Sequence, residues 1–140
     1  MTTVRMWYEP GHGDQGLTAT TEDELRAALD AFITDEHYLS IMQMVITDSD
    51  GHDVLMELAA ASKDEQGALR YSSSAHVWFS QGEPTDYEVM EFAYYRTPHS
   101  FPTDSLIPIE EVRQAAAEFL TSGGQRPTCV RWQADADSEG

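Results

Sequence analysis

The sequence predicts an α+β fold, with a single curved antiparallel sheet of about five to seven strands and two helices packed on one side. Two segments carry apolar residues at helical spacing, and they lie far apart in the chain. The apolar runs between them are short, and turn residues separate them, which is typical of antiparallel strands. A chain of 140 residues with 41% hydrophobic residues can bury the core of one such domain.

The N-terminal third is predicted to form a strand followed by a helix. Residues 3–8 are a short strand, and the glycine-rich stretch 11–16 after them is a turn, because the lysine and hydroxyl pair of a phosphate-binding loop is missing. Residues 21–34 are a helix. Thr21 and Glu24 have the spacing of a capping box at its start.

A hairpin is predicted for residues 41–47 and 53–59. The turn between them contains an Asp-Gly step, a strong hairpin signal. Its aspartates also resemble the start of a calcium loop, but Gly51 comes too early and Ala59 stands where that loop needs a glutamate. The pattern therefore favours a hairpin over a metal site.

Three further strands are predicted at 68–72, 75–80 and 88–96. The turn 81–84 leads from the second to the third, so these two are expected to be neighbours. The third alternates: Met90, Phe92 and Tyr94 point to the core, and Val89, Glu91, Ala93 and Tyr95 point to the other face. Because that other face combines a carboxylate with a tyrosine, it is a candidate binding surface.

The C-terminal part is predicted to be a loop, a helix and a closing strand. The loop is 97–108, the helix 108–122 and the strand 128–133. Residues 1–134 then form one domain, and 135–140 form an acidic flexible tail.

The formal net charge of −17 excludes several classes of function. Such a surface repels nucleic acid and anionic membranes, whereas it attracts a basic partner. No apolar run reaches the length of a membrane span, and the N-terminus does not resemble a signal peptide. We expect a cytoplasmic protein without direct nucleic-acid or membrane binding, monomeric or weakly homodimeric through a sheet edge.

Cys129, the only cysteine, is the first candidate for catalysis. It lies inside the predicted closing strand, away from a helix N-terminus or a paired histidine that could lower its pKa. We therefore expect it to be buried and structural. The usual metal-binding and nucleophile motifs are also missing, so the sequence predicts no enzyme, no catalytic residue, no metal and no cofactor.

The run from Ser100 to Gln133 carries a specific pattern. It reads F-P-x-D-S-x-I-P, then V-R-x-A-x-x-E-F-L, then a glycine pair and R-P-T-C-V-R-W-Q. The positions are Phe101, Pro102, Asp104, Ser105, Ile107, Pro108, Val112, Arg113, Ala115, Glu118, Phe119, Leu120, Gly123, Gly124 and 126–133. This pattern resembles immunity protein family one of bacterial polymorphic toxin systems.

The resemblance implies a cytosolic antitoxin without catalysis or a cofactor. Such a protein binds and neutralises the toxin domain encoded beside it, often a deaminase that acts on nucleic acid. An acidic surface complements the basic surface that such a toxin presents to its substrate. Because the motif's apolar residues suit packing, we expect the contacts elsewhere. The interface candidates are Trp78, Asp86, Glu88, Glu91 and Tyr95, with Trp78 on the strand beside the aromatic one.

An alternative function is a small-molecule-binding module for resistance or regulation. It requires an aromatic pocket under the helices, lined by Trp7, Trp78, Phe92 and Tyr94.

Overall fold

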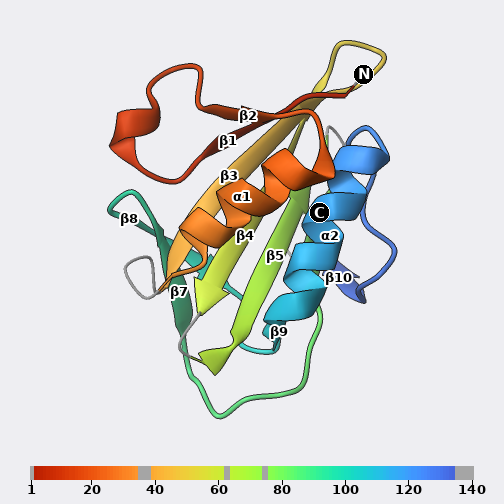
Figure 1. Ribbon diagram of the computed structural model, residues 1–140. Helices are drawn as coiled ribbons and strands as arrows, with labels where there is room; N and C mark the ends of the chain where they lie inside the picture. Colours follow the sequence, from red (N-terminus) through yellow and green to blue (C-terminus); the bar gives the residue numbers. More distant parts are fainter. Residues whose placement is uncertain (1, 35–38, 62–63, 74–75, 135–140) are drawn as a thin grey trace.

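Two helices cover one face of a ten-stranded sheet in the computed structural model, which describes residues 2–34, 39–61, 64–73 and 76–134 (Figure 1). The α+β class, the antiparallel sheet and the one-sided helices are confirmed, and the sheet has more strands than predicted. Neither helix in this part of the chain is long and apolar enough to cross a membrane. The predicted tail, 135–140, lies outside the described residues.

The helices are α1 (Glu22–Phe32) and α2 (Ile109–Thr121), with a 3-10 turn, η1, at Pro10–His12. The strands are β1 (Val4–Trp7), β2 (Leu17–Ala19), β3 (Ser40–Thr47), β4 (Asp53–Ala61), β5 (Gln66–Ser72), β6 (Val77–Ser80), β7 (Met90–Tyr94), β8 (Thr97–Phe101), β9 (Ile107–Pro108) and β10 (Trp132–Ala134). The main path through the sheet is β10-β6-β5-β4-β3-β1-β2. β9 pairs with β5, and β7 pairs with β8 and meets β3 at one parallel position.

Local sequence signals account for the helix ends. Thr21 caps α1 by accepting the backbone N–H of Glu24 at 3.1 Å, and the Glu24 carboxylate accepts the N–H of Thr21 at 3.2 Å. The predicted capping box is therefore confirmed. α2 ends at Thr121 and is followed by Gly123 and Gly124, which both have positive φ and donate their N–H groups to the carbonyls of the last turn.

The predicted hairpin between β3 and β4 is also confirmed. The strands pair from Thr47 opposite Asp53 down to Ser40 opposite Ala60. Gly51 takes a φ of 84° in the connecting turn and donates its N–H to the Asp48 carbonyl at 3.0 Å. This conformation suits glycine, so the Asp-Gly step determines the turn.

Two predictions about the C-terminal half are wrong. The predicted loop 97–108 contains β8, which pairs with β7 from Thr97 opposite Tyr94 to Phe101 opposite Met90. Pro98 favours a loop, yet β8 has β7 as its partner and leaves its other edge unpaired, where proline is tolerated. The closing strand begins at Trp132 instead of residue 128.

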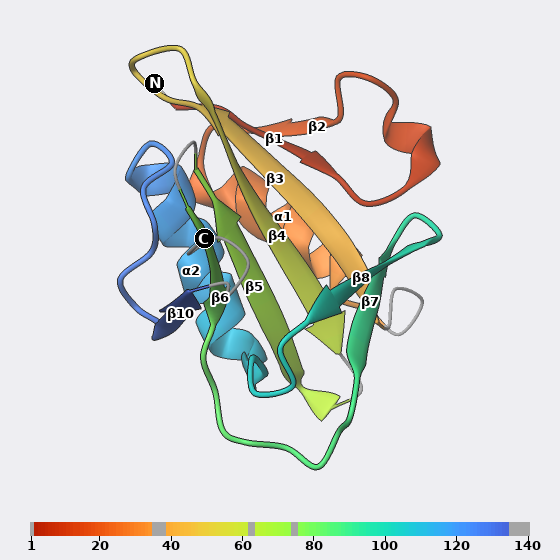
Figure 2. The same ribbon diagram turned by 180° about the vertical axis from the view of Figure 1, so that it is seen from behind.

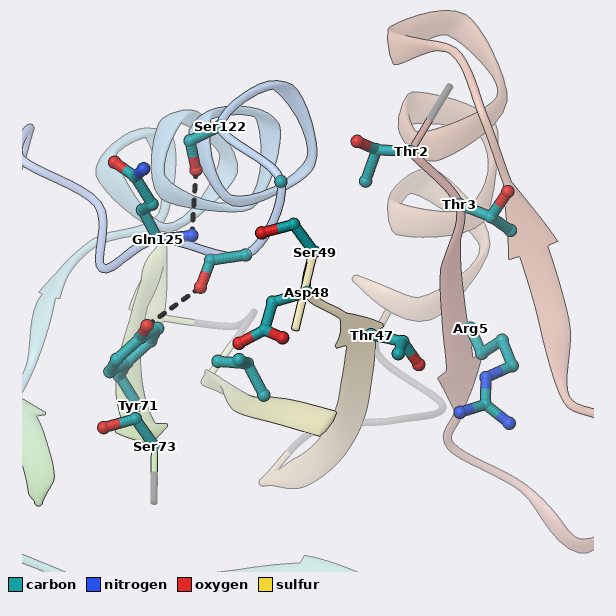
Figure 3. Close-up of a pocket in the computed structure, with 13 residues that line it drawn as sticks. Thr2, Thr3, Arg5, Thr47, Asp48, Ser49, Tyr71, Ser73, Ser122 and Gln125 are labelled. Carbon is teal, nitrogen blue, oxygen red and sulfur yellow. Dashed lines mark hydrogen bonds between the residues drawn. The ribbon is translucent and has the colours of Figure 1, made fainter. Parts of the chain in front are cut away.

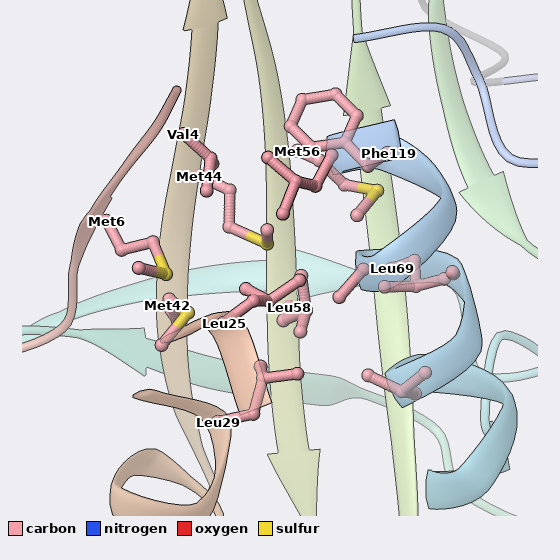
Figure 4. Close-up of a cluster of buried hydrophobic side chains, with 14 of the residues drawn as sticks. Val4, Met6, Leu25, Leu29, Met42, Met44, Met56, Leu58, Leu69 and Phe119 are labelled. Atoms are coloured by element: carbon pink, nitrogen blue, oxygen red, sulfur yellow. The ribbon is translucent and has the colours of Figure 1, made fainter. Parts of the chain in front are cut away.

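Side chains from alternate positions along the strands form two clusters. On the helix side, Met6, Met42, Met44 and Met56 pack with leucines of α1 and with Phe119 of α2 (Figure 4). Methionine fills irregular gaps well, which suits the space between two helices and a twisted sheet. On the opposite side, the residues of the second cluster are buried under the β7–β8 hairpin: Ile41, Ala59, Ala61, Ala68, Phe79, Met90, Phe92 and Phe101.

Candidate functional site

An exposed segment of alternating acids and apolar residues precedes and includes β7 on the side of the molecule away from the helices (Figure 2). We call it the acidic strip. It consists of the exposed side chains of Asp86, Tyr87, Glu88, Val89, Glu91 and Tyr95. Four of the five predicted interface residues, Asp86, Glu88, Glu91 and Tyr95, belong to it.

The loop before the acidic strip is fixed by hydrogen bonds to the segment that follows β8. Gly82 donates its N–H to the Asp104 carbonyl at 2.7 Å, and the Thr85 hydroxyl donates to the Thr103 carbonyl at 2.6 Å. A Cβ at Gly82 would overlap the Leu106 carbonyl, so glycine is required for this close approach. The loop that leads into the acidic strip is therefore held in one position at its start.

Tyr95 forms the tip of the β7–β8 hairpin in a conformation that is rare for a bulky residue. Its φ is 60°, and its ring stacks on Tyr94 with centroids 4.3 Å apart. Burial, with the neighbouring Tyr95 and Glu57, raises the pKa of Tyr94 well above its usual range, so Tyr94 stays neutral. Tyr95 itself is 39% exposed, so part of its ring is free for contact.

Glu57 is a buried carboxylate beneath the hairpin, with only 1% of its surface exposed. It accepts a hydrogen bond from Gln43 Nε2 at 2.9 Å and lies 3.2 Å from His99 Nδ1 and 3.5 Å from an Arg70 guanidinium nitrogen. Since Glu57 is on β4 and His99 on β8, this cluster ties the hairpin to the sheet. This cluster was not predicted from the sequence, although the glutamate inside the apolar run of β4 was a signal for it.

Trp78, the fifth candidate, lies elsewhere. Its strand pairs with β5 and β10, so it is not the neighbour of β7, and that prediction is wrong. The side chain is half-buried on the helix side of the sheet, and the Arg126 guanidinium lies 4.3 Å from its ring centroid. Trp78 thus faces away from the acidic strip, and its role in binding remains a prediction.

Two exposed apolar residues, Leu39 and Tyr87, were not among the candidates predicted from the sequence, whereas Val89 was already placed on the outward face of the aromatic strand. Val89 is 67% exposed, Tyr87 57% and Leu39 41%. Tyr87 and Val89 alternate with the acids of the run DYEVME, a pattern that could have marked the segment. Exposed apolar side chains gathered in one place indicate a contact surface.

The aromatic residues of the small-molecule alternative do not form one pocket. Trp78 packs against the helix-side cluster, whereas Phe92 and Tyr94 belong to the cluster under the hairpin. Trp7 donates its indole N–H to the Gly13 carbonyl at 2.9 Å. The four aromatic side chains are therefore divided among separate places and do not line one common pocket.

A shallow polar depression of about 890 Å³ lies at the end of the sheet near the N-terminus (Figure 3). Asp48 on its wall accepts the N–H groups of Asp50 and His52, each at 2.9 Å, and so stabilises the β3–β4 turn. Ligand atoms of these three residues lie within 4.8 Å of one another, but the turn accounts for their arrangement.

Cys129 is exposed, so the prediction that it is buried is wrong. The Glu118 carboxylate of α2 accepts the backbone N–H groups of Thr128 at 2.9 Å and Cys129 at 3.2 Å. These bonds hold residues 128–130 in bends outside the sheet. Partial burial and the Glu118 carboxylate raise the pKa of the thiol to about 11, which is the opposite of what a catalytic cysteine needs.

The model of the family described as Immunity protein Imm1 matches residues 13–134, most of the chain. The chain belongs to the Imm1 family. A search of curated proteins found no match.

The motif that resembles Imm1 proteins has a structural role in this member. Gln133 of β10 donates to the Ser80 carbonyl at 3.1 Å and to Asp104 Oδ1 at 2.9 Å, and the Ser80 hydroxyl donates to the Ser105 carbonyl at 2.7 Å. Glu118 holds the 128–129 turn as described above. These motif residues connect α2, the loop after β8 and the last strand, so they build the Imm1 scaffold around the acidic strip.

Proposed function

We propose that this Imm1-family protein is a cytoplasmic immunity protein that binds and neutralises a cognate toxin domain through the acidic strip. The toxin we infer is a basic protein that acts on nucleic acid, a deaminase or a nuclease of a polymorphic toxin system. The observation that carries the proposal is the run of acids and exposed apolar side chains from Asp86 to Tyr95, held on a fixed loop and hairpin.

Charge supports this choice of partner. A nucleic-acid enzyme must present a basic surface to the phosphates of its substrate. The immunity protein carries 25 acidic against 8 basic residues, so attraction over a distance speeds the encounter and depends on salt. Binding is sufficient for neutralisation, and no chemical step by this chain is required.

The apolar side chains within the strip support a stable complex after the first, charge-driven encounter. Interfaces draw most of their affinity from a few aromatic or charged anchors that become desolvated. Tyr87 and Tyr95 are exposed tyrosines, a residue type enriched at interfaces. Acids around them select a basic partner and orient it.

The test begins with co-expression of the protein and the toxin domain encoded beside its gene. We expect cell survival and a stable complex. The variant Asp86→Asn/Glu88→Gln/Glu91→Gln should weaken toxin affinity about 10- to 100-fold at low salt, since it removes charges opposite a basic surface. The loss should shrink at high salt because salt already screens the attraction that these three charges contribute in the wild-type protein.

A matched control removes the same charge elsewhere. Glu22→Gln/Asp23→Asn/Asp50→Asn changes three exposed acids of α1 and the β3–β4 turn. It should retain toxin affinity within a few fold. Equal losses of affinity in both triple variants would show that net charge alone causes the effect. An unchanged affinity of the strip variant would show that the strip is not part of the interface.

A further inference from the structure

Three of the four large exposed apolar residues in the described chain line a single groove at the base of the β7–β8 hairpin. They are Leu39, Tyr87 and Val89. The groove has a volume of about 210 Å³, and its other apolar lining is Ala61, Met90, Phe92 and Leu106. Since Phe92 and Met90 are buried in the cluster under the hairpin, the floor of the groove is apolar and packed against the core.

Leu39, which lines this groove, has an unfavourable backbone conformation. Its φ is 62°, a left-handed value that is unfavourable for a leucine. Two backbone hydrogen bonds fix it there, one from its N–H to the Ala60 carbonyl and one from the Ala93 N–H to its carbonyl, each 2.8 Å long. Strained residues that the surroundings fix in place cluster at functional sites.

The rim of the groove is acidic. Glu91 and Asp64 line it, and the exposed Asp86 and Glu88 flank Tyr87 in the chain. At about 210 Å³ it is smaller than the roughly 300–1,000 Å³ typical of small-molecule pockets. Its size and its rim therefore suit one apolar side chain that has basic neighbours.

We propose that this groove is the specificity pocket of the immunity protein, and that it receives one apolar side chain of the toxin flanked by arginine or lysine. This inference rests on the proposed function. The apolar walls contribute contact that salt does not screen, and the rim contributes attraction that salt does screen. The two contributions can be separated by experiment.

The test uses the complete chain and the toxin domain encoded beside its gene. Leu39→Asn removes an apolar wall and keeps a residue that adopts the left-handed conformation. Val89→Ser removes a side chain that is 67% exposed, so it leaves the core intact. Each variant should retain the thermal midpoint of the wild-type protein and weaken toxin binding about tenfold, or about 1.4 kcal/mol. Gln114→Ser on the exposed side of α2 is the control and should bind like the wild type.

The second measurement is the toxin affinity of each variant at low and at high salt. The loss in Leu39→Asn and Val89→Ser should be the same factor at low and at high salt, unlike the loss in the acidic triple variant. Amide hydrogen exchange of the wild-type protein should slow at residues 87–91 in the complex. If both groove variants bind within about twofold of wild type while the acidic triple variant still weakens binding, the groove is overturned and the proposed function stands. Unprotected amides at residues 87–91 would overturn the groove and the acidic strip together. Absence of any complex with the wild-type protein overturns both.

Discussion

The carboxylates of this protein divide into those that bind within the fold and those that face solvent. Glu57 is buried among Gln43, Arg70 and His99, and Glu118 accepts the N–H groups of Thr128 and Cys129. Hydrogen bonds from Thr128 lower the pKa of Glu118, so its contribution to stability is fully present above its unfolded pKa and is lost as the pH falls through its lower folded-state pKa. Within the part of the chain that the structure describes, Asp86, Glu88 and Glu91 are exposed and accept no such hydrogen bonds. They are therefore available to a partner.

The thiol of Cys129 gives a residue-scale prediction. Its pKa of about 11 keeps it protonated at pH 8, so the wild-type protein should react slowly with iodoacetamide. Glu118→Gln removes a negative charge beside the thiol and should increase the alkylation rate at pH 8 several-fold. Glu110→Gln, an exposed glutamate of the same helix, is the control. Equal rates in all three proteins would contradict the assigned role of Glu118.

Because the folded-state pKa of the Cys129 thiol is raised, the thiol's contribution to stability is present at lower pH and is lost as the pH rises toward about 11.

At the scale of elements, local signals predict α1 well and the C-terminal strands poorly. The capping box and the apolar spacing that determine α1 lie within its own sequence, and the helix was predicted at 21–34 and observed at Glu22–Phe32. The closing strand was predicted four residues too long at its start because the Glu118 side chain accepts the N–H groups of residues 128 and 129. That contact joins distant parts of the chain, and strand periodicity carries no information about it.

Gly82 gives a prediction for the loop that leads to the strip. Gly82→Ala should destabilise the protein by about 1–3 kcal/mol, because its Cβ would overlap the Leu106 carbonyl and force the loop apart. Gly11→Ala is the control, since a Cβ there meets nothing within 4 Å. Urea denaturation measures both. If Gly82→Ala were as stable as Gly11→Ala, the close approach of the two loops would be wrong.

For the whole molecule, the candidate site was predicted in part. Asp86, Glu88, Glu91 and Tyr95 fall on one exposed segment because they are neighbours in the chain. Trp78 does not join them, since the segment after β6 crosses the base of the molecule to reach β7 (Figure 2). Leu39 could not be assigned to the site from sequence, because tertiary folding alone brings it beside Val89.

The net charge of −17 yields a prediction for global stability. Repulsion among the acids opposes the compact state, and salt screens it. Raising NaCl from about 0.02 M to 0.3 M should increase the thermal midpoint by about 3–6 °C, if screening recovers about 1 kcal/mol. The control triple variant Glu22→Gln/Asp23→Asn/Asp50→Asn should gain less. A midpoint that is constant or falls with salt would show that repulsion is unimportant here.

The acidic strip ends at Tyr95, and the motif of the family begins at Ser100, so the two share no residue. The motif side chains hold α2, the loop after β8 and the last strand together, whereas the strip residues project outward from that framework. Substitutions at the strip therefore change the surface with little effect on packing. An engineer who randomised residues 86–89 and 91, kept the buried Met90 and selected for survival against a different toxin would be working on a replaceable module, and could obtain mutually orthogonal antitoxins from one scaffold.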